Sequence, residues 1–94
     1  MASQYKLKVS DEVRNFIRRL HPSIKQKVRV ALSEILEDQL CGKPLRGELE
    51  GLRSFRVGKL RIIYRQASNI IEIIAIGPRR IIYEETLRLI QRDK

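Results

Sequence analysis

Two arginines of the sequence are spaced so that together they could hold a phosphate group. The dipeptide Gly58-Lys59 separates two apolar-rich segments, which is typical of a two-residue hairpin turn with glycine where a positive φ is needed. Such a turn pairs Val57 with Leu60 and, one residue further out, Arg56 with Arg61. We therefore expect the two arginines to lie directly opposite each other on neighbouring strands.

This arrangement is unfavourable unless an anion lies between the two arginines. Like charges opposite each other in a sheet repel. At ~5.5 Å and an effective dielectric near 20 the raw repulsion is roughly 3 kcal/mol, which splayed side chains reduce severalfold. A phosphate between Arg56 and Arg61 reverses the sign, because guanidinium groups bind phosphate oxygens bidentately. The alternative is two solvated arginines that diverge into water. The opposite, apolar face of the hairpin is expected to be the core face, with Phe55, Val57, Leu60 and Ile62.

A second basic segment follows the most apolar strand of the sequence. Gly77-Pro78 ends that strand, and Arg79, Arg80 and then Tyr83 come directly after it. We expect the strand to deliver these residues to one edge of the sheet. Tyr83 could equally be a core aromatic of the last helix, whereas Tyr64 falls on the core face and is expected to be structural.

Other kinds of site find little support in the sequence. The single histidine, His21, lies between two expected helices, where a helix-capping or surface role is expected. Cys41, the only cysteine, is expected to be a small filler near a helix end rather than a nucleophile, since no histidine lies near it in sequence. The sequence has neither a metal-ligand cluster nor a glycine-rich phosphate loop before a helix. We therefore expect no metal and no other cofactor, and a chemistry that arginine, lysine and tyrosine carry.

Cleavage of RNA is a reaction that these residue types can support. RNA carries its own nucleophile, the 2′-hydroxyl next to the scissile phosphate. An enzyme must align this oxygen, move its proton and stabilise the charge that develops on phosphorus, and arginines can supply the electrostatic part. A tyrosine can relay the proton if nearby cations lower its pKa from the ordinary value near ~10.

The net charge of +9 and the pI near 10.3 point to an anionic partner. Nucleic acid, an anionic surface or an acidic protein would each fit, and a charge that only keeps the protein soluble is the alternative. The charge is unevenly placed, because no acidic residue occurs from Gly51 to Ile71. Five cations fall in that stretch: Arg53, Arg56, Lys59, Arg61 and Arg65.

A length of 94 residues predicts one domain over residues 1–94, with a core large enough to fold alone. No apolar run approaches the ~18–20 residues of a membrane span. The segment Met1–Lys6 lacks the apolar stretch of a signal peptide, and a single cysteine cannot form an internal disulfide. These features favour a cytoplasmic location.

The apolar periodicity predicts an α+β fold in the order βααβββα. The small, mostly antiparallel twisted sheet would be packed by an N-terminal helical hairpin and followed by a short C-terminal helix. Ser10 is expected to cap the first helix, and Pro22 to begin a second helix that reaches Leu40 and ends near Gly42. The remaining segments are a loop over residues 42–52, strands over 5–9, 53–57, 60–65 and 70–76, the last buried on both faces, and a helix from about Ile81 to Gln91.

The sequence resembles the RelE/ParE superfamily of bacterial and archaeal toxins. The resemblance covers nearly the whole chain and rests on the runs Lys43-Pro44-Leu45-Arg46-Gly47, Phe55-Arg56-Val57-Gly58, Arg61-Ile62-Ile63-Tyr64-Arg65, Ile76-Gly77-Pro78-Arg79-Arg80 and Ile82-Tyr83. It implies a toxin of a type II toxin–antitoxin pair, neutralised by an acidic antitoxin that wraps it. In the RelE branch such a toxin cuts messenger RNA in the ribosomal A site without a metal. The ParE branch shares the fold and is implicated in inhibiting DNA gyrase by binding, without catalysis of its own.

The resemblance also implies site residues. Arg56, Arg61, Arg79 and Tyr83 match the family's catalytic positions. Ser54 stands where RelE-type enzymes often carry a second basic residue, and Pro78 where many relatives carry histidine. The further residues expected to contact RNA are Lys43, Arg46, Arg53, Lys59, Arg65 and Arg80. The expected partners are the antitoxin, the ribosome and messenger RNA.

Overall fold

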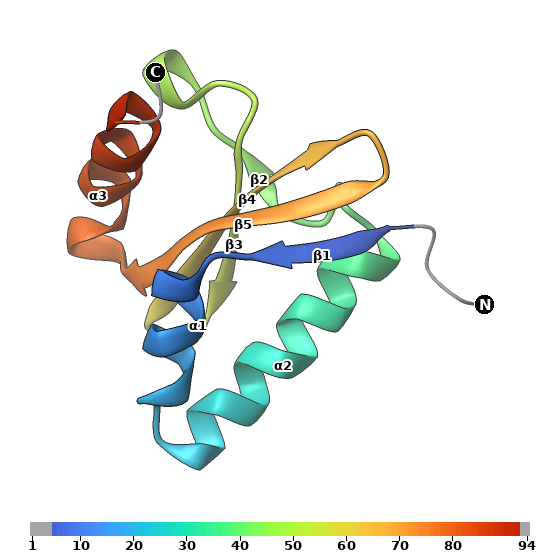
Figure 1. Ribbon diagram of the computed structural model, residues 1–94, viewed down its shortest axis with the longest axis vertical. Coiled ribbons are helices and arrows are strands. Elements are labelled where there is room, and N and C mark those ends of the chain that lie inside the picture. The colour runs from blue at the N-terminus through green and yellow to red at the C-terminus, as the bar shows by residue number, and fades with distance from the viewer. Residues whose placement is uncertain (1–4, 93–94) are drawn as a thin grey trace.

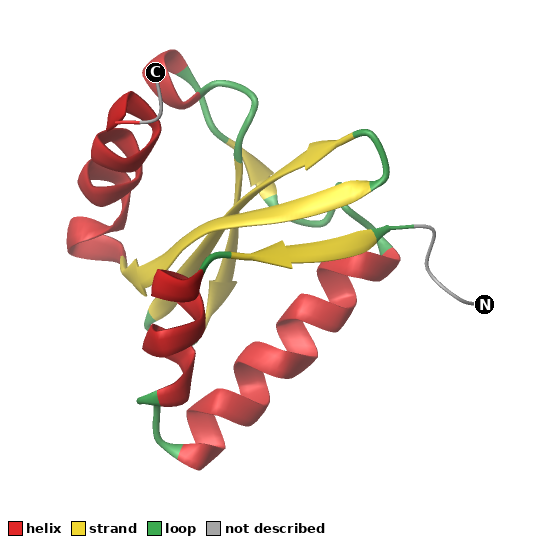
Figure 2. Cartoon of the chain, in the orientation of Figure 1, coloured by secondary structure: helices red, strands yellow, loops and turns green. Residues whose placement is uncertain are grey.

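The computed structural model describes residues 5–92 and confirms the α+β class. Residues 1–4, which we expected to carry no signal sequence, lie outside this range. A five-stranded sheet in the order β1-β5-β4-β3-β2 forms the centre of the molecule (Figures 1 and 2). Its strands are β1 (Lys6–Val9), β2 (Lys43–Pro44), β3 (Arg53–Val57), β4 (Leu60–Ala67) and β5 (Ile70–Pro78). The helices are α1 (Asp11–Arg18), α2 (Pro22–Glu37) and α3 (Arg79–Arg92), with a short 3₁₀ turn, η1, at Gly47–Leu49.

The sheet is antiparallel except at one edge, where β1 runs parallel to β5. The hairpin between β3 and β4 has the predicted register. Val57 pairs with Leu60 and Arg56 with Arg61, and Gly58 adopts a φ of 58° in the turn. The expected face-to-face arrangement of the two arginines is therefore confirmed.

Helices cover both faces of the sheet. The α1–α2 hairpin packs on the face that carries Val57, Ile62 and Tyr64, and these form the larger core. On the opposite face, α3 packs its Ile82 against Ile63 and Ala75 in a second, smaller core. The face that carries the two arginines is therefore partly covered, with its own apolar centre.

A β-bulge lies between β4 and β5. Ile63 pairs with Ala75 and Tyr64 with Ile73, so Ile74 is an extra residue in β5. Because of the extra residue, Ile73 belongs to the core under α1 and α2, whereas Ala75, two residues later, belongs to the core under α3. Both strands thus contribute buried side chains to two cores.

The helix starts follow the predicted capping. The Ser10 hydroxyl accepts a hydrogen bond from the Val13 amide at 3.2 Å and begins α1. The His21 ring accepts from the Ser23 amide, also at 3.2 Å, and begins α2 with Pro22 in its first turn. The capping role expected for His21 is confirmed.

The end of α2 was predicted too late. The helix ends at Glu37, and Leu40, which we expected on its buried face, is 59% exposed. Cys41 is also exposed, so the expectation that it fills a gap is wrong. The cause is a set of contacts from the sheet. The Tyr64 hydroxyl donates to the Gln39 carbonyl at 2.8 Å and accepts from the Gly42 amide at 2.9 Å, which draws this backbone away from helical geometry.

Further boundaries differ from the predictions. Strand β4 extends to Ala67, and β5 extends through Gly77-Pro78, where it was expected to end. The segment expected to be a loop over 42–52 contains β2 and η1. The two residues of β2 are too few to show a pattern, and Lys43 and Pro44 pair with Ser54 and Arg53 of β3. The last helix begins at Arg79, two residues earlier than expected, so that the arginines after Pro78 lie in its first turn.

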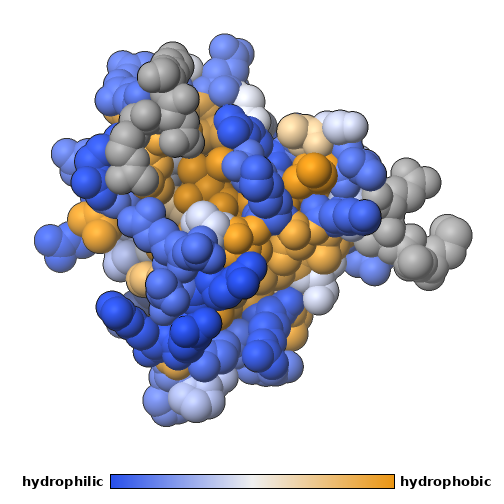
Figure 3. Space-filling model, in the orientation of Figure 1, coloured by the Kyte–Doolittle hydropathy of each residue, from blue (hydrophilic) through white to orange (hydrophobic). Residues whose placement is uncertain are grey.

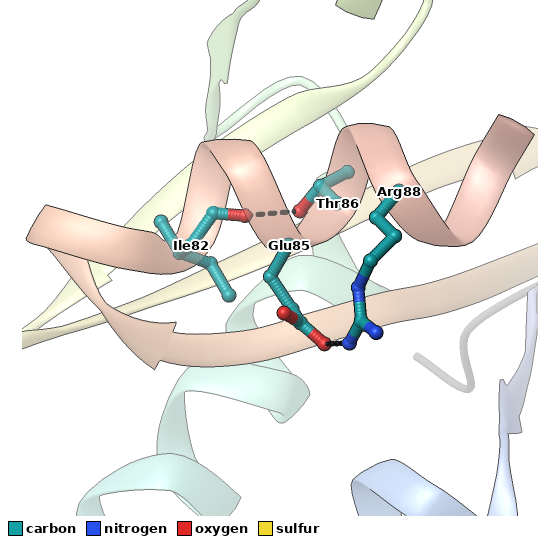
Figure 4. A network of polar contacts seen from close by, with 4 residues as sticks. All are labelled: Ile82, Glu85, Thr86 and Arg88. Carbon is teal, nitrogen blue, oxygen red and sulfur yellow. Dashed lines mark hydrogen bonds and ion pairs between the residues drawn. The ribbon is translucent and has the colours of Figure 1, made fainter.

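Within α3, Thr86 is fully buried and its hydroxyl donates to the Ile82 carbonyl at 2.6 Å (Figure 4). On the exposed side of the same helix Glu85 pairs with Arg88. The helix thus turns an apolar face with one internally satisfied hydroxyl toward the sheet.

Among residues 5–92, no helix is long and apolar enough to cross a membrane.

Candidate functional site

Arg56 and Arg61 form the centre of the candidate site, on the α3 side of the sheet. Arg56 is exposed, and its Nε donates to the Gly58 carbonyl at 3.3 Å. Arg61 is partly exposed, and β5 places Gly77 on its other side. A residue without a side chain therefore flanks Arg61, and the space beside it is taken by α3, because a Cβ at Gly77 would lie 3.2 Å from Cδ1 of Ile82.

Tyr83 reaches the same face from α3. Its hydroxyl lies 3.5 Å from the Ser54 hydroxyl, and Ser54 is two residues before Arg56 on β3. Because alternate residues of a strand share a face, Ser54 and Arg56 point to the same side. Tyr83 is half-buried and packs beside the second core, so it has both a packing role and a hydroxyl on the arginine face. The packing alternative is confirmed, whereas a chemical role of the hydroxyl stays a prediction.

Arg79 follows β5 directly and lies near the turn of the β3–β4 hairpin. Gly77 pairs with Arg61 and Pro78 with Leu60, so the chain passes beside the Gly58-Lys59 turn as it begins α3. Arg79 and Arg80 are both exposed in the first turn of this helix. Register therefore places the start of α3, with Arg79, next to the strand pair that carries Arg56 and Arg61.

The other cations fall into two groups. Lys43 pairs with Ser54 across β2 and β3 and so shares the face of the site, and it is exposed, as are Lys59, Arg80 and Arg46. Two others are held by the chain itself. Arg65 forms an ion pair with Glu72 at 2.8 Å, and Arg53 donates to the carbonyls of Gly42 at 2.7 Å and Leu40 at 3.3 Å.

Ser54 is the residue whose place in the site the sequence did not indicate. We noted it only as a missing cation, yet it is 4% exposed and its hydroxyl faces that of Tyr83. Strand alternation puts Ser54 on the face of Arg56, which is a usable signal. The position of Tyr83 over it depends on how α3 packs, which no local pattern reveals.

Comparison with known proteins places the chain in a family. The family model for the ParE toxin of the type II toxin–antitoxin system, parDE, matches residues 4–83. No curated protein matches the chain. Among solved structures, the toxin–antitoxin complex RelBE2 from Mycobacterium tuberculosis contains a chain with 30% identity and a TM-score of 0.70, over 80% of this chain and 98% of that one.

Two E. coli structures share the fold at lower identity. A mutant of the RelE toxin in the free state has 18% identity and a TM-score of 0.76, over 97% of this chain and 98% of that one. A chain of the intact RelBE toxin–antitoxin complex has 20% identity and a TM-score of 0.69, over 79% and 95% of the respective chains. At such identities the likeness concerns the fold alone.

The fold and the basic sheet face define a class, that of small α+β toxins with a helical hairpin on one side of the sheet and a terminal helix on the other. The chain belongs to the RelE/ParE superfamily and is a toxin of a type II toxin–antitoxin system.

Proposed function

We propose that the protein is a ribosome-dependent endoribonuclease that cleaves messenger RNA without a metal ion. The observation that carries the proposal is the cationic face on which Arg56 lies opposite Arg61 and the Tyr83 hydroxyl lies over β3, 3.5 Å from Ser54. This face offers cations for a phosphate and a hydroxyl group for a proton.

The reaction would break the bond between phosphorus and the 5′-oxygen. The 2′-oxygen of the preceding nucleotide attacks phosphorus in line and loses its proton, while the leaving 5′-oxygen gains one. The products carry a 2′,3′-cyclic phosphate and a 5′-hydroxyl end. Arg61, Arg56 and Arg79 hold the phosphate and stabilise the charge that develops on its oxygens, the electrostatic contribution that is often the largest in such reactions.

Tyr83 would orient or relay the proton. Its hydroxyl is on the arginine face, and Ser54 beneath it is close enough to fix its direction. Lys43, opposite Ser54, and the exposed cations Arg46, Lys59 and Arg80 would contact the flanking RNA. In this mechanism the Tyr83 hydroxyl transfers the proton, and the cations bind the RNA.

We also propose an acidic antitoxin as the partner that holds this activity in check. The M. tuberculosis RelBE2 and E. coli RelBE structures, which contain related chains, are toxin–antitoxin complexes. An acidic segment that folds on contact suits a protein of charge +9, because charges steer the encounter and ordering is deferred to binding.

A second candidate function is inhibition of DNA gyrase by binding, without catalysis. The match of residues 4–83 to the ParE toxin family favours it. In that case the two arginines would contact a protein or DNA surface, and Tyr83 would serve only packing.

A translation assay with a parallel gyrase assay separates the two functions. Translating ribosomes given the protein should yield messenger RNA cut at the A site with 2′,3′-cyclic phosphate ends, and mapping of the 3′ ends detects them. Chelation by EDTA should leave the chemical step intact when ribosome integrity is controlled. Intact messenger RNA together with blocked supercoiling would overturn the proposal in favour of gyrase inhibition.

The substitution Tyr83→Phe tests the proton transfer. If the hydroxyl moves a proton, cleavage should slow by ~10²–10⁴, because general acid–base catalysis contributes about that much. Ser54→Ala keeps the Tyr83 hydroxyl and removes only its neighbour, so the loss should be smaller. Single-turnover cleavage on programmed ribosomes gives both rates. Equal, small losses in the two variants would show that Tyr83 only packs.

A further inference from the structure

The helical hairpin carries a second cationic stretch that the proposed site does not use. From Val13 to Ser33 the sequence has no acidic residue, and six cations occur there: Arg14, Arg18, Arg19, Lys25, Lys27 and Arg29. This stretch is as free of acids as the one from Gly51 to Ile71. It belongs to α1 and α2, which pack on the side of the sheet that lies away from Arg56 and Arg61.

Four of these cations line one groove, here called the hairpin groove. Arg14 and Arg18 of α1 face Lys25 and Arg29 of α2 across a hollow of about 310 Å³, with Val9 and Ile17 as its apolar lining. Arg14, Arg18 and Arg29 are exposed and Lys25 is partly exposed. No acidic side chain lines the groove.

Among residues 5–92, the groove cations have no anionic partner. The ion pairs among residues 5–92 are Arg65–Glu72 and Arg88–Glu85, and neither involves the groove. Each helix contributes two cations four residues apart, and like charges at that spacing destabilise a helix by a few tenths of a kcal/mol per pair. An anionic ligand would relieve this repulsion.

The spacing of the cations fits a chain of phosphates. At a rise of 1.5 Å per residue, cations four residues apart on a helix are about 6 Å apart along its axis. This separation is comparable to that between successive phosphates of a nucleic-acid strand. Two such pairs on facing helices form a track of four positive charges rather than a pocket for a single small anion.

We propose that the hairpin groove binds the phosphate backbone of a second nucleic-acid segment, which in the proposed function is ribosomal RNA. This inference rests on the proposed function for the identity of the RNA. The sheet separates the groove from the candidate site, and the molecule measures 22 Å along its shortest axis. The protein would thus bind its substrate strand on one face and structured RNA on the other.

The test compares two variants with the same change in net charge. The groove variant carries Arg14→Gln, Arg18→Gln, Lys25→Gln and Arg29→Gln. The control variant carries Lys6→Gln, Lys8→Gln, Arg19→Gln and Lys27→Gln, four exposed cations that do not line the groove. Binding to ribosomes is measured from 0.05 to 0.3 M salt in an Arg61→Ala background, so that cleavage does not consume the ligand.

The groove variant should bind at least about tenfold more weakly than the control variant, and its log–log salt slope should be shallower by about 3, because each lost phosphate contact removes 0.7–0.9 from the slope. Thermal melts check that both variants fold. Equal slopes in the two variants would overturn the proposal. So would unchanged ribosome binding by the groove variant together with lost binding to poly-glutamate, which would indicate an acidic protein at this groove.

The test also separates the groove from the proposed function. If the protein with Arg61 intact cleaves no messenger RNA but the groove variant still loses its salt slope, the groove stands and the nuclease proposal fails. If the protein cleaves messenger RNA but the groove and control variants have equal salt slopes, the nuclease proposal stands and the groove proposal fails. Double-stranded DNA as a competitor decides whether the groove distinguishes RNA from DNA.

Discussion

Arg61 is the side chain on which the proposed chemistry depends most. It lies between Arg56 on one neighbouring strand and Gly77 on the other, and it forms no ion pair among the residues that the structure describes. Arg61→Ala should slow cleavage by ~10²–10³, the cost of one preorganised contact to developing charge. Single-turnover cleavage measures the loss.

The same substitution should leave the fold intact. Arg61 repels Arg56 across the strand pair, so the free energy of unfolding should change by less than about 1 kcal/mol and can rise. Lys27→Ala, which removes an exposed cation from α2, is the matched control and should cleave normally. An Arg61→Ala protein that melts like the wild type and still cleaves at the wild-type rate would show that the site is elsewhere.

At this scale, strand alternation and turn length were enough to locate the arginines. A two-residue turn leaves only one register, and register decides which side chains share a face. The structural role of Arg53 could not be read in the same way. Its partners are the carbonyls of Leu40 and Gly42, and their position depends on where α2 ends.

At the scale of elements, Tyr64 ties the middle of the sheet to the end of α2. Its side chain is fully buried, and its hydroxyl bonds to both Gln39 and Gly42. A Cβ at position 42 would lie 2.5 Å from the Tyr64 oxygen, so only glycine fits there without movement. The periodicity of Leu36 and Leu40 predicted a longer helix because it carries no information about this contact. Strand β2 was not predicted for a related reason. Tyr64 and Arg53 bind the backbone of residues 39–42, which lead into β2, and the local sequence does not show these contacts.

Tyr64→Phe should destabilise the fold by about 1–3 kcal/mol at neutral pH. The substitution leaves the Gly42 amide and the Gln39 carbonyl without their partner, and an unsatisfied buried group costs about this much. Urea denaturation at pH 8 measures the difference. The control is Tyr83→Phe. The Tyr83 hydroxyl lies 3.5 Å from its partner, a longer and weaker contact than those of Tyr64, so this variant should lose less stability.

The effect should also depend on pH. Burial raises the pKa of Tyr64 to about 12, above the value of 10.0 that the group has when unperturbed. The folded state therefore keeps the proton between these values while the unfolded state releases it, so wild-type stability falls as the pH rises from 10 toward 12. Phenylalanine does not titrate, and the stability gap between wild type and Tyr64→Phe should narrow over this interval. A gap that stays constant up to pH 12 would contradict the assigned role.

At the scale of the whole molecule, charge is the dominant property. The net charge is +9, and cations gather on the arginine face of the sheet and in the hairpin groove on the other side. The composition predicted an anionic partner, but it did not indicate the groove. The basic stretch was not recognised in the sequence because acids lie at both ends of the helical hairpin. These acids are Asp11, Glu12, Glu34, Glu37 and Asp38. In Figure 3, hydrophilic side chains cover much of the surface around a limited apolar area.

Co-expression with the adjacent reading frame tests the proposed partner. We expect a short acidic protein that restores growth and co-purifies with the toxin, and an association rate that falls as salt rises from 0.05 to 0.5 M, because screening weakens charge steering. The rate can be followed by stopped-flow fluorescence or surface plasmon resonance. A neighbouring protein that neither rescues growth nor co-purifies would count against an antitoxin encoded there.

The parallel pairing of β1 with β5 determines when during synthesis the protein can become active. Lys6 pairs with Ile70, so these partners are separated by most of the chain, and contacts between such distant segments form late in folding. The ribosome makes β1 first, and this strand must wait for β5. Tyr83, which completes the arginine face from α3, is made later still. We expect the nascent chain to remain harmless while most of it is being translated, since its strands emerge before the helix that carries the hydroxyl group. Delayed assembly of this kind gives an antitoxin made at the same time an interval in which to meet the toxin before its site is complete.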